Sequence, residues 1–146
     1  MRFGIMAVVF LATTGSAAAS GGLSCDVEDQ SARISVASGV TRGMGSPVFN
    51  FKAALEILDK GVTEDLRKAE FDNATQYWLD GENLRLVLYR ERAGDKPHGY
   101  VELTILTQAG DDEGLYGGSY KLAVFDYATG ADQSWDFEGQ ISCFVE

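Results

Sequence analysis

The chain has 146 residues, a formal net charge of −10 at pH 7 and 11% aromatic residues. This length allows one domain with a sizeable apolar core. The negative charge excludes nucleic acid and anionic membrane surfaces as good partners, because both repel an acidic protein.

Residues 1–19 have the parts of a secretory signal peptide. Arg2 supplies the basic start, an apolar run reaches Leu11, and small residues end at Ala19, before Ser20. The apolar run is shorter than the roughly 20 residues that a membrane helix needs. We therefore expect residues 1–19 to be removed. Residues 20–146 should form one exported domain, periplasmic or extracellular, without membrane insertion.

Two cysteines, Cys25 and Cys143, stand near the two ends of the expected mature chain. An even pair of cysteines in an exported protein is typical of a disulfide. This bridge would join the first strand to the last and stabilise the fold by about 4–5 kcal/mol. Because His98 is the only histidine, we expect neither a metal site nor another cofactor.

Apolar and polar residues alternate with a period of two in several segments. The pattern is clearest in residues 49–57, where the apolar residues of one face are Phe49, Phe51, Ala53, Leu55 and Ile57. Residues 32–36 and 101–107 read as further strands rich in β-branched side chains. Residues 63–66, where Thr63 precedes two acids, favour one turn of helix.

A hairpin is predicted in residues 75–89, with its turn at Asp80-Gly81. Tyr77 and Leu79 then share a face with the leucines of residues 84–88, whether the loop has two residues or four. The two registers differ by two residues and so preserve the facing of every side chain. Trp78 and Tyr89 consequently lie on the opposite face.

Residues 120–145 form a second predicted hairpin, with a loop at residues 128–131. In the predicted register Val124 faces Trp135 and Leu122 faces Phe137, so apolar side chains meet. A slip by one residue would set both against acidic residues. The same register places Lys121 opposite Glu138.

Glycine-rich or charged connections separate these strands at residues 39–47, 92–99 and 109–118. The chain shows no repeat and no change of composition. We predict an all-β fold of about seven to nine antiparallel strands, forming one sandwich or closed barrel with one disulfide. Length alone does not distinguish a sandwich from a barrel.

Motifs of enzymes are missing from the sequence. It has no Gly-x-Ser-x-Gly elbow, no phosphate-binding glycine loop and no His-Glu-x-x-His. Acidic residues are so frequent that a carboxylate pair of the glycosidase type would arise by chance. We therefore expect a protein that is not an enzyme.

The connection at residues 109–118 is the main candidate for binding, since charged loops lie on the surface, where binding usually resides. Exposed aromatic side chains of the first hairpin would extend the surface. The predicted binding residues are Asp111, Asp112, Glu113 and Tyr116, together with Trp78 and Tyr89. Whether the three acids bind calcium stays open, because their spacing matches no EF-hand.

Small size, acidity, export and a single disulfide together resemble several groups of envelope binding proteins and inhibitors, including those that block basic cell-wall hydrolases. The resemblance implies a non-enzymatic protein that binds a basic protein or another envelope component. Two alternatives are a barrel that carries a small apolar ligand beside Tyr77, Leu86 and Ile105, and a carboxylate-dependent hydrolase of envelope polymer. The sequence does not predict the oligomeric state.

Overall fold

The computed structural model describes residues 20–41, 48–128 and 130–146. The expected signal peptide and residues 42–47 of the first glycine-rich connection lie outside the described residues. The described residues form nine strands and one short helix: β1 (Ser20–Glu28), β2 (Ala32–Thr41), β3 (Val48–Ile57), α1 (Glu64–Arg67), β4 (Lys68–Phe71), β5 (Gln76–Leu79), β6 (Asn83–Glu91), β7 (Gly99–Ala109), β8 (Leu115–Asp126) and β9 (Gln133–Val145). No helix in these ranges is long and apolar enough to cross a membrane.

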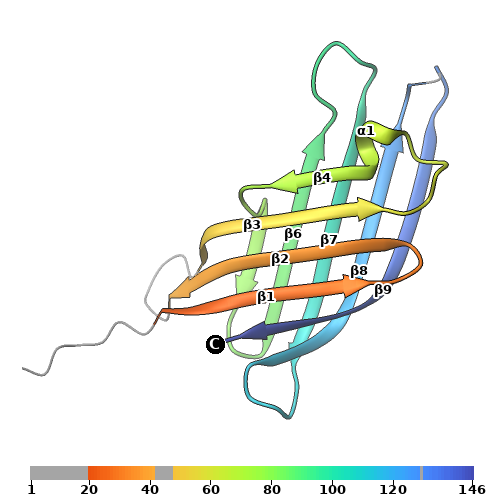
Figure 1. The fold of residues 1–146 in the computed structure, drawn as a ribbon. Coiled ribbons are helices and arrows are strands. Elements are labelled where there is room, and N and C mark those ends of the chain that lie inside the picture. The colour runs from red at the N-terminus through yellow and green to blue at the C-terminus, as the bar shows by residue number, and fades with distance from the viewer. Residues whose placement is uncertain (1–19, 42–47, 129) are drawn as a thin grey trace, which may run out of the picture.

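All described strands belong to one antiparallel sheet in the order β4-β3-β2-β1-β9-β8-β7-β6-β5. The sheet curls into a half-barrel, so that β1–β4 run across β5–β9 (Figure 1). Contacts of β4 with β6 and of α1 with β7 join the two layers. The predicted all-β antiparallel class is confirmed. The sheet stays open, because β4 and β5 are its two edges.

The disulfide between Cys25 and Cys143 is confirmed. The two residues are register partners in β1 and β9, their Cα atoms lie 4.1 Å apart, and each is 1% exposed. Because β9 also pairs with β8, the bridge lies where the two layers of the curled sheet meet.

The inner faces of the two layers form a filled core. Inward side chains at the centre are 0–1% exposed: Leu86, Leu103, Ile105, Tyr120 and Leu122. A cavity large enough for a water molecule beside any of these side chains would leave part of that side chain's surface exposed. The Tyr120 hydroxyl donates to Asp29 Oδ2 at 2.6 Å. Burial first, and then this hydrogen bond, raises the pKa of Tyr120.

The predicted facing of the first hairpin and the predicted register of the second are confirmed. In the first, Trp78 pairs with Arg85 and Leu79 with Leu84, so the loop has four residues. In the second, Val124 pairs with Trp135 and Lys121 with Glu138. Their inward residues on β6 and β8 are buried, Trp135 and Phe137 on β9 are partly buried, and Tyr77 on the edge strand β5 is 38% exposed.

The prediction for Phe49 is wrong. The pairing of β2 with β3 shifts between Ala37–Lys52 and Gly39–Phe49, which leaves one extra residue in β3. Asn50, with a φ of 50°, accommodates this bulge. Phe49 therefore points to the outer face, is 41% exposed, and lies against Gly39, where a side chain would collide with its ring.

Two predicted connections are shorter than expected. Gly39–Thr41 continue β2, and Leu115–Gly118 begin β8. The predicted helical turn is confirmed as α1, which begins after Thr63. The Thr63 side chain does not cap this helix. Instead its hydroxyl donates to Asp126 Oδ2 at 2.6 Å.

Candidate functional site

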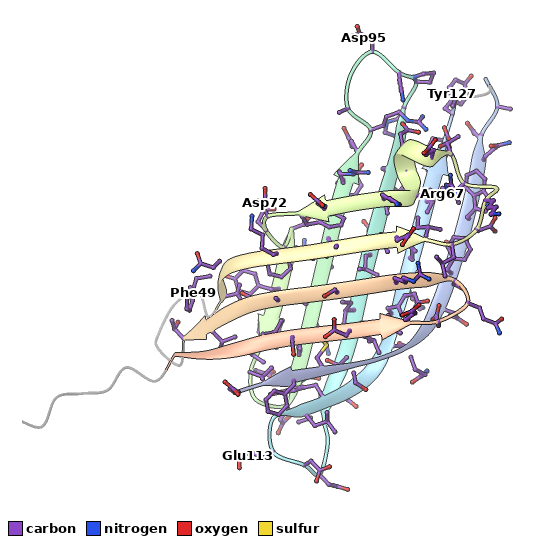
Figure 2. All side chains as sticks on the ribbon, in the orientation of Figure 1. Phe49, Arg67, Asp72, Asp95, Glu113 and Tyr127 are labelled. Atoms are coloured by element: carbon purple, nitrogen blue, oxygen red, sulfur yellow. A yellow bond between two sulfur atoms is a disulfide. The ribbon has the colours of Figure 1, made fainter. Side chains whose placement is uncertain are left out.

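The predicted acidic residues lie in a short loop, residues 110–114, between β7 and β8. Asp111, Asp112 and Glu113 are all exposed, and Figure 2 shows Glu113 at the end of the molecule opposite Asp95. Backbone hydrogen bonds hold the loop, from Leu115 N to Asp112 O at 3.1 Å and from Val145 N to Gly114 O at 2.8 Å. Three carboxylates are thus presented to solvent from a fixed backbone.

Tyr116 does not belong to this loop, and the expectation that it sits beside the acids is wrong. It is the second residue of β8, opposite Cys143, and is 6% exposed. The reason is parity: once β8 begins at Leu115, Tyr116 points into the core. Its ring therefore contributes to stability rather than to a surface.

Two apolar side chains take the place at the surface that was predicted for Tyr116. Leu115 and Phe144 are register partners in β8 and β9, both point outward, and they are 39% and 44% exposed. The Phe144 ring lies against the acidic loop, since a Cβ added at Gly114 would come within 2.9 Å of it. We call Asp111, Asp112, Glu113, Leu115 and Phe144 together the loop end.

Trp78 is the most exposed large apolar residue described, at 58%. Its indole N–H donates to Asp80 Oδ2 at 2.8 Å, and the backbone N–H groups of Asn83 and Glu82 donate to Asp80 Oδ1 at 2.7 and 2.9 Å. These bonds, that from Trp78 first, lower the pKa of Asp80. The backbone N–H of Ala109 donates to Glu82 O at 2.8 Å, so the turn that holds Trp78 adjoins the acidic loop.

Tyr89 lies on the same face of the sheet but away from the loop end. It is 37% exposed, its hydroxyl donates to Glu91 Oε1 at 2.9 Å, and its ring centroid lies 5.5 Å from that of Tyr100. Phe125 and His98 extend this aromatic group, with Tyr100 and Phe125 stacked at 5.7 Å. The structure therefore brings Trp78 near the acids and leaves Tyr89 in a separate cluster.

Two hollows lie on the outer face, the side of β5–β9 that points away from β1–β4. One, of about 480 Å³, is lined by residues of β6–β9. The other, of about 520 Å³, follows it along β7–β9. The outward residues of β8 that line them are Gly117, Ser119, Lys121 and Ala123, which alternate with inward residues of the strand.

A buried charge cluster occupies the opposite end of the half-barrel. Arg92 and Asp126 are 3% and 1% exposed and are joined by a 2.8 Å ion pair. All five N–H donors of Arg92 are used, on Asp65, Pro97 O, Asp126 and Thr63. Hydrogen bonds from Arg92 and Thr63 hold the pKa of Asp126 at about 2. With no donor left for a ligand, this cluster ties α1 and the β6–β7 loop to β8.

The described residues contain no group of three or more histidine, cysteine, aspartate or glutamate side chains arranged to hold a metal ion. No family model matches the chain, and no curated protein or solved structure is significantly similar to it. The geometry of the described residues therefore carries the argument for function.

Sequence reasoning missed Leu115, Phe144 and the Arg92 cluster. The exposure of Phe144 could have been predicted, because its neighbour Cys143 points inward and successive side chains of a strand point to opposite faces. The Arg92 cluster had no such signal, since its residues are 63, 65, 92 and 126 and meet only in the folded chain.

Proposed function

We propose that this chain is an exported, non-enzymatic binding protein of the cell envelope that captures a basic protein through its loop end. The observation that carries the proposal is the exposed Leu115–Phe144 pair beside three exposed carboxylates. An apolar centre with a charged rim is the usual anatomy of a protein–protein interface. A large aromatic residue next to the centre is typical of its energetic core.

Charge supports a basic partner in two ways. The formal net charge of −10 attracts a cationic protein over long range. Close to the surface, Asp111, Asp112 and Glu113 offer carboxylates to arginine and lysine side chains, and the fixed loop backbone limits the entropy lost on binding.

The two alternative functions find less support in the described residues. A carrier needs internal space, whereas Leu86 and Ile105, which would line it, are both 0% exposed. A general acid of a hydrolase needs a raised carboxyl pKa. The displaced carboxyl pKa values here are all lowered, at Asp29, Glu56, Asp65, Asp80 and Asp126.

Affinity capture tests the proposal. The immobilised protein is exposed to envelope extract, and bound proteins are identified by mass spectrometry. We expect a basic protein to be retained at about 0.05 M salt and largely released at 0.5 M, because the Debye length falls from over 10 Å to a few ångströms. A triple variant with Asp111→Asn, Asp112→Asn and Glu113→Gln should retain at least about tenfold less, as should Phe144→Ser.

A second triple variant is the control for net charge: Glu70→Gln, Asp72→Asn and Asp95→Asn remove as much charge from exposed positions outside the loop end. This control should bind nearly as well as the parent. If both triple variants lose capture equally, overall charge explains the effect, and specific binding at the loop end is refuted. Unchanged capture by the loop variants would refute the proposal altogether.

A further inference from the structure

A row of outward side chains crosses the outer face near the loop end. The register pairs Trp78 with Arg85, Arg85 with Leu106, Leu106 with Ser119, and Ser119 with Gln140. These five residues come from five neighbouring strands, so their side chains lie side by side. Four of them, all but Trp78, line the first hollow.

Trp78 provides a rigid and accessible ring at one end of this row. The side chain is 58% exposed, yet its indole N–H is held by Asp80, which the turn backbone holds in turn. A ring fixed in this way loses little freedom on binding. It offers an apolar face against which the C–H face of a sugar ring can stack.

The two hollows follow one another along β8, and we call them together the trough. Three of the four outward residues of β8 that line it are small, and nothing lies within 4 Å of a Cβ built at Gly117. From Gly117 to Ala123 the two hollows follow six residues of strand, about 20 Å. This shape accommodates a linear chain rather than a compact ligand.

The charges in the trough are close to balance, unlike those of the whole protein. Arg85 is the only charged residue of the first hollow and forms no ion pair with any residue that the structure describes. In the second hollow Lys121 lies among Glu102, Asp136 and Glu138. The free guanidinium repels a basic chain, and the three carboxylates repel an acidic one. The charge pattern is complementary to an uncharged polar chain.

Hydrogen-bonding groups complete the lining. Asn83, Gln108 and Gln140 place amides around Arg85, and these groups donate to and accept from hydroxyls. We propose that the trough, together with Trp78 beside Arg85 at its edge, binds a linear neutral polysaccharide, with Trp78 stacked on a sugar ring and Arg85 and the amides bonded to sugar hydroxyls. This second ligand goes beyond the capture of a basic protein and does not depend on it.

Affinity electrophoresis of the purified full chain tests the proposal. Native gels contain one of four neutral polysaccharides: hydroxyethyl cellulose, arabinoxylan, galactomannan or glycol chitin. Carboxymethyl cellulose is the anionic counterpart of hydroxyethyl cellulose. We expect at least one neutral polymer to retard the protein and carboxymethyl cellulose to bind it at least about tenfold more weakly than that polymer. Trp78→Ala and Arg85→Ala should each weaken the retardation about tenfold.

Phe144→Ser and the triple variant at Asp111, Asp112 and Glu113 are the matched controls, because they alter the loop end without changing the trough. They should be retarded like the parent, whatever their effect on protein capture. The thermal unfolding temperatures of Trp78→Ala and Arg85→Ala should equal that of the parent, since both residues are exposed. The proposal is wrong if no neutral polymer retards the parent, if retardation survives both Trp78→Ala and Arg85→Ala, or if the anionic polymer binds equally well.

Discussion

Replacing Arg92 by methionine tests whether the buried charge cluster holds together the end of the half-barrel opposite the loop end. The substitution keeps the apolar stem but removes five hydrogen bonds and leaves the 1% exposed Asp126 without a cation. Breaking a buried pair in this way costs about 3–5 kcal/mol, because the remaining charge stays desolvated. For a domain of this size, this is a fall of about 10–20 °C in Tm.

Lowering the pH should reduce the difference in the free energy of unfolding between Arg92→Met and the parent. The folded-state pKa of Asp126 is about 2, below its ordinary 3.8, so its contribution is complete above about pH 4 and is lost as the pH falls through 2. In Arg92→Met the same carboxylate is buried without a cation, which favours its protonated form and raises its pKa. The loss of stability in the variant should therefore be full at pH 7 and smaller at pH 3.

Urea denaturation at both pH values, with the disulfide intact, measures the free energy of unfolding. Arg33→Met is a matched control, because Arg33 also pairs with two carboxylates, Glu28 and Glu56, but is 52% exposed. Exposed pairs of this kind contribute about 0–1 kcal/mol. If Arg92→Met loses no more stability than Arg33→Met at pH 7, the buried cluster contributes no more to stability than an exposed ion pair, and the reasoning is refuted.

Two further predictions concern the scaffold. Replacing Cys25 and Cys143 together by serine should cost about 4–5 kcal/mol in urea denaturation, because the bridge spans a sequence separation of 118 residues; a loss below about 1 kcal/mol would contradict this account. Gly118→Ala should cost about 1–3 kcal/mol, since its Cβ would collide with backbone of β7 at Leu106, whereas Gly117→Ala, in open space, should leave Tm nearly unchanged. Equal melting temperatures of the two alanine variants would disprove the close approach at Gly118.

The alternation of apolar and polar residues along the chain determined much of this fold. The facing of the first predicted hairpin follows from it. The register of the second follows too, because a slip of one residue would turn Val124 and Leu122 toward acids. The disulfide followed from cysteine number and expected export. Each of these features depends on a single strand, a single turn or a single pair of residues.

The candidate surfaces were only partly predictable. The acidic loop was recognisable from its charges, and Trp78 was correctly placed on the face opposite the leucines. Tyr116 was assigned to the loop and not to a strand, because Gly117 and Gly118, which follow it, are residues typical of loops, whereas they belong to β8. The bulge at Asn50 reversed Phe49 for a similar reason: one extra residue changes the parity of everything beyond it.

Only the tertiary structure decided which strands meet and which side chains stay uncovered. Pairing of β9 with β1 joins segments far apart in the chain, and no period in the sequence encodes the order of strands in the sheet. The same holds for Arg92, whose partners come from α1, its own loop and β8. The sequence around Trp78 and Phe144 alternates in the same way as it does around side chains that another layer covers. Their exposure results from the curl of the sheet, which sets β1–β4 against one face of β5–β9 and leaves the other face open.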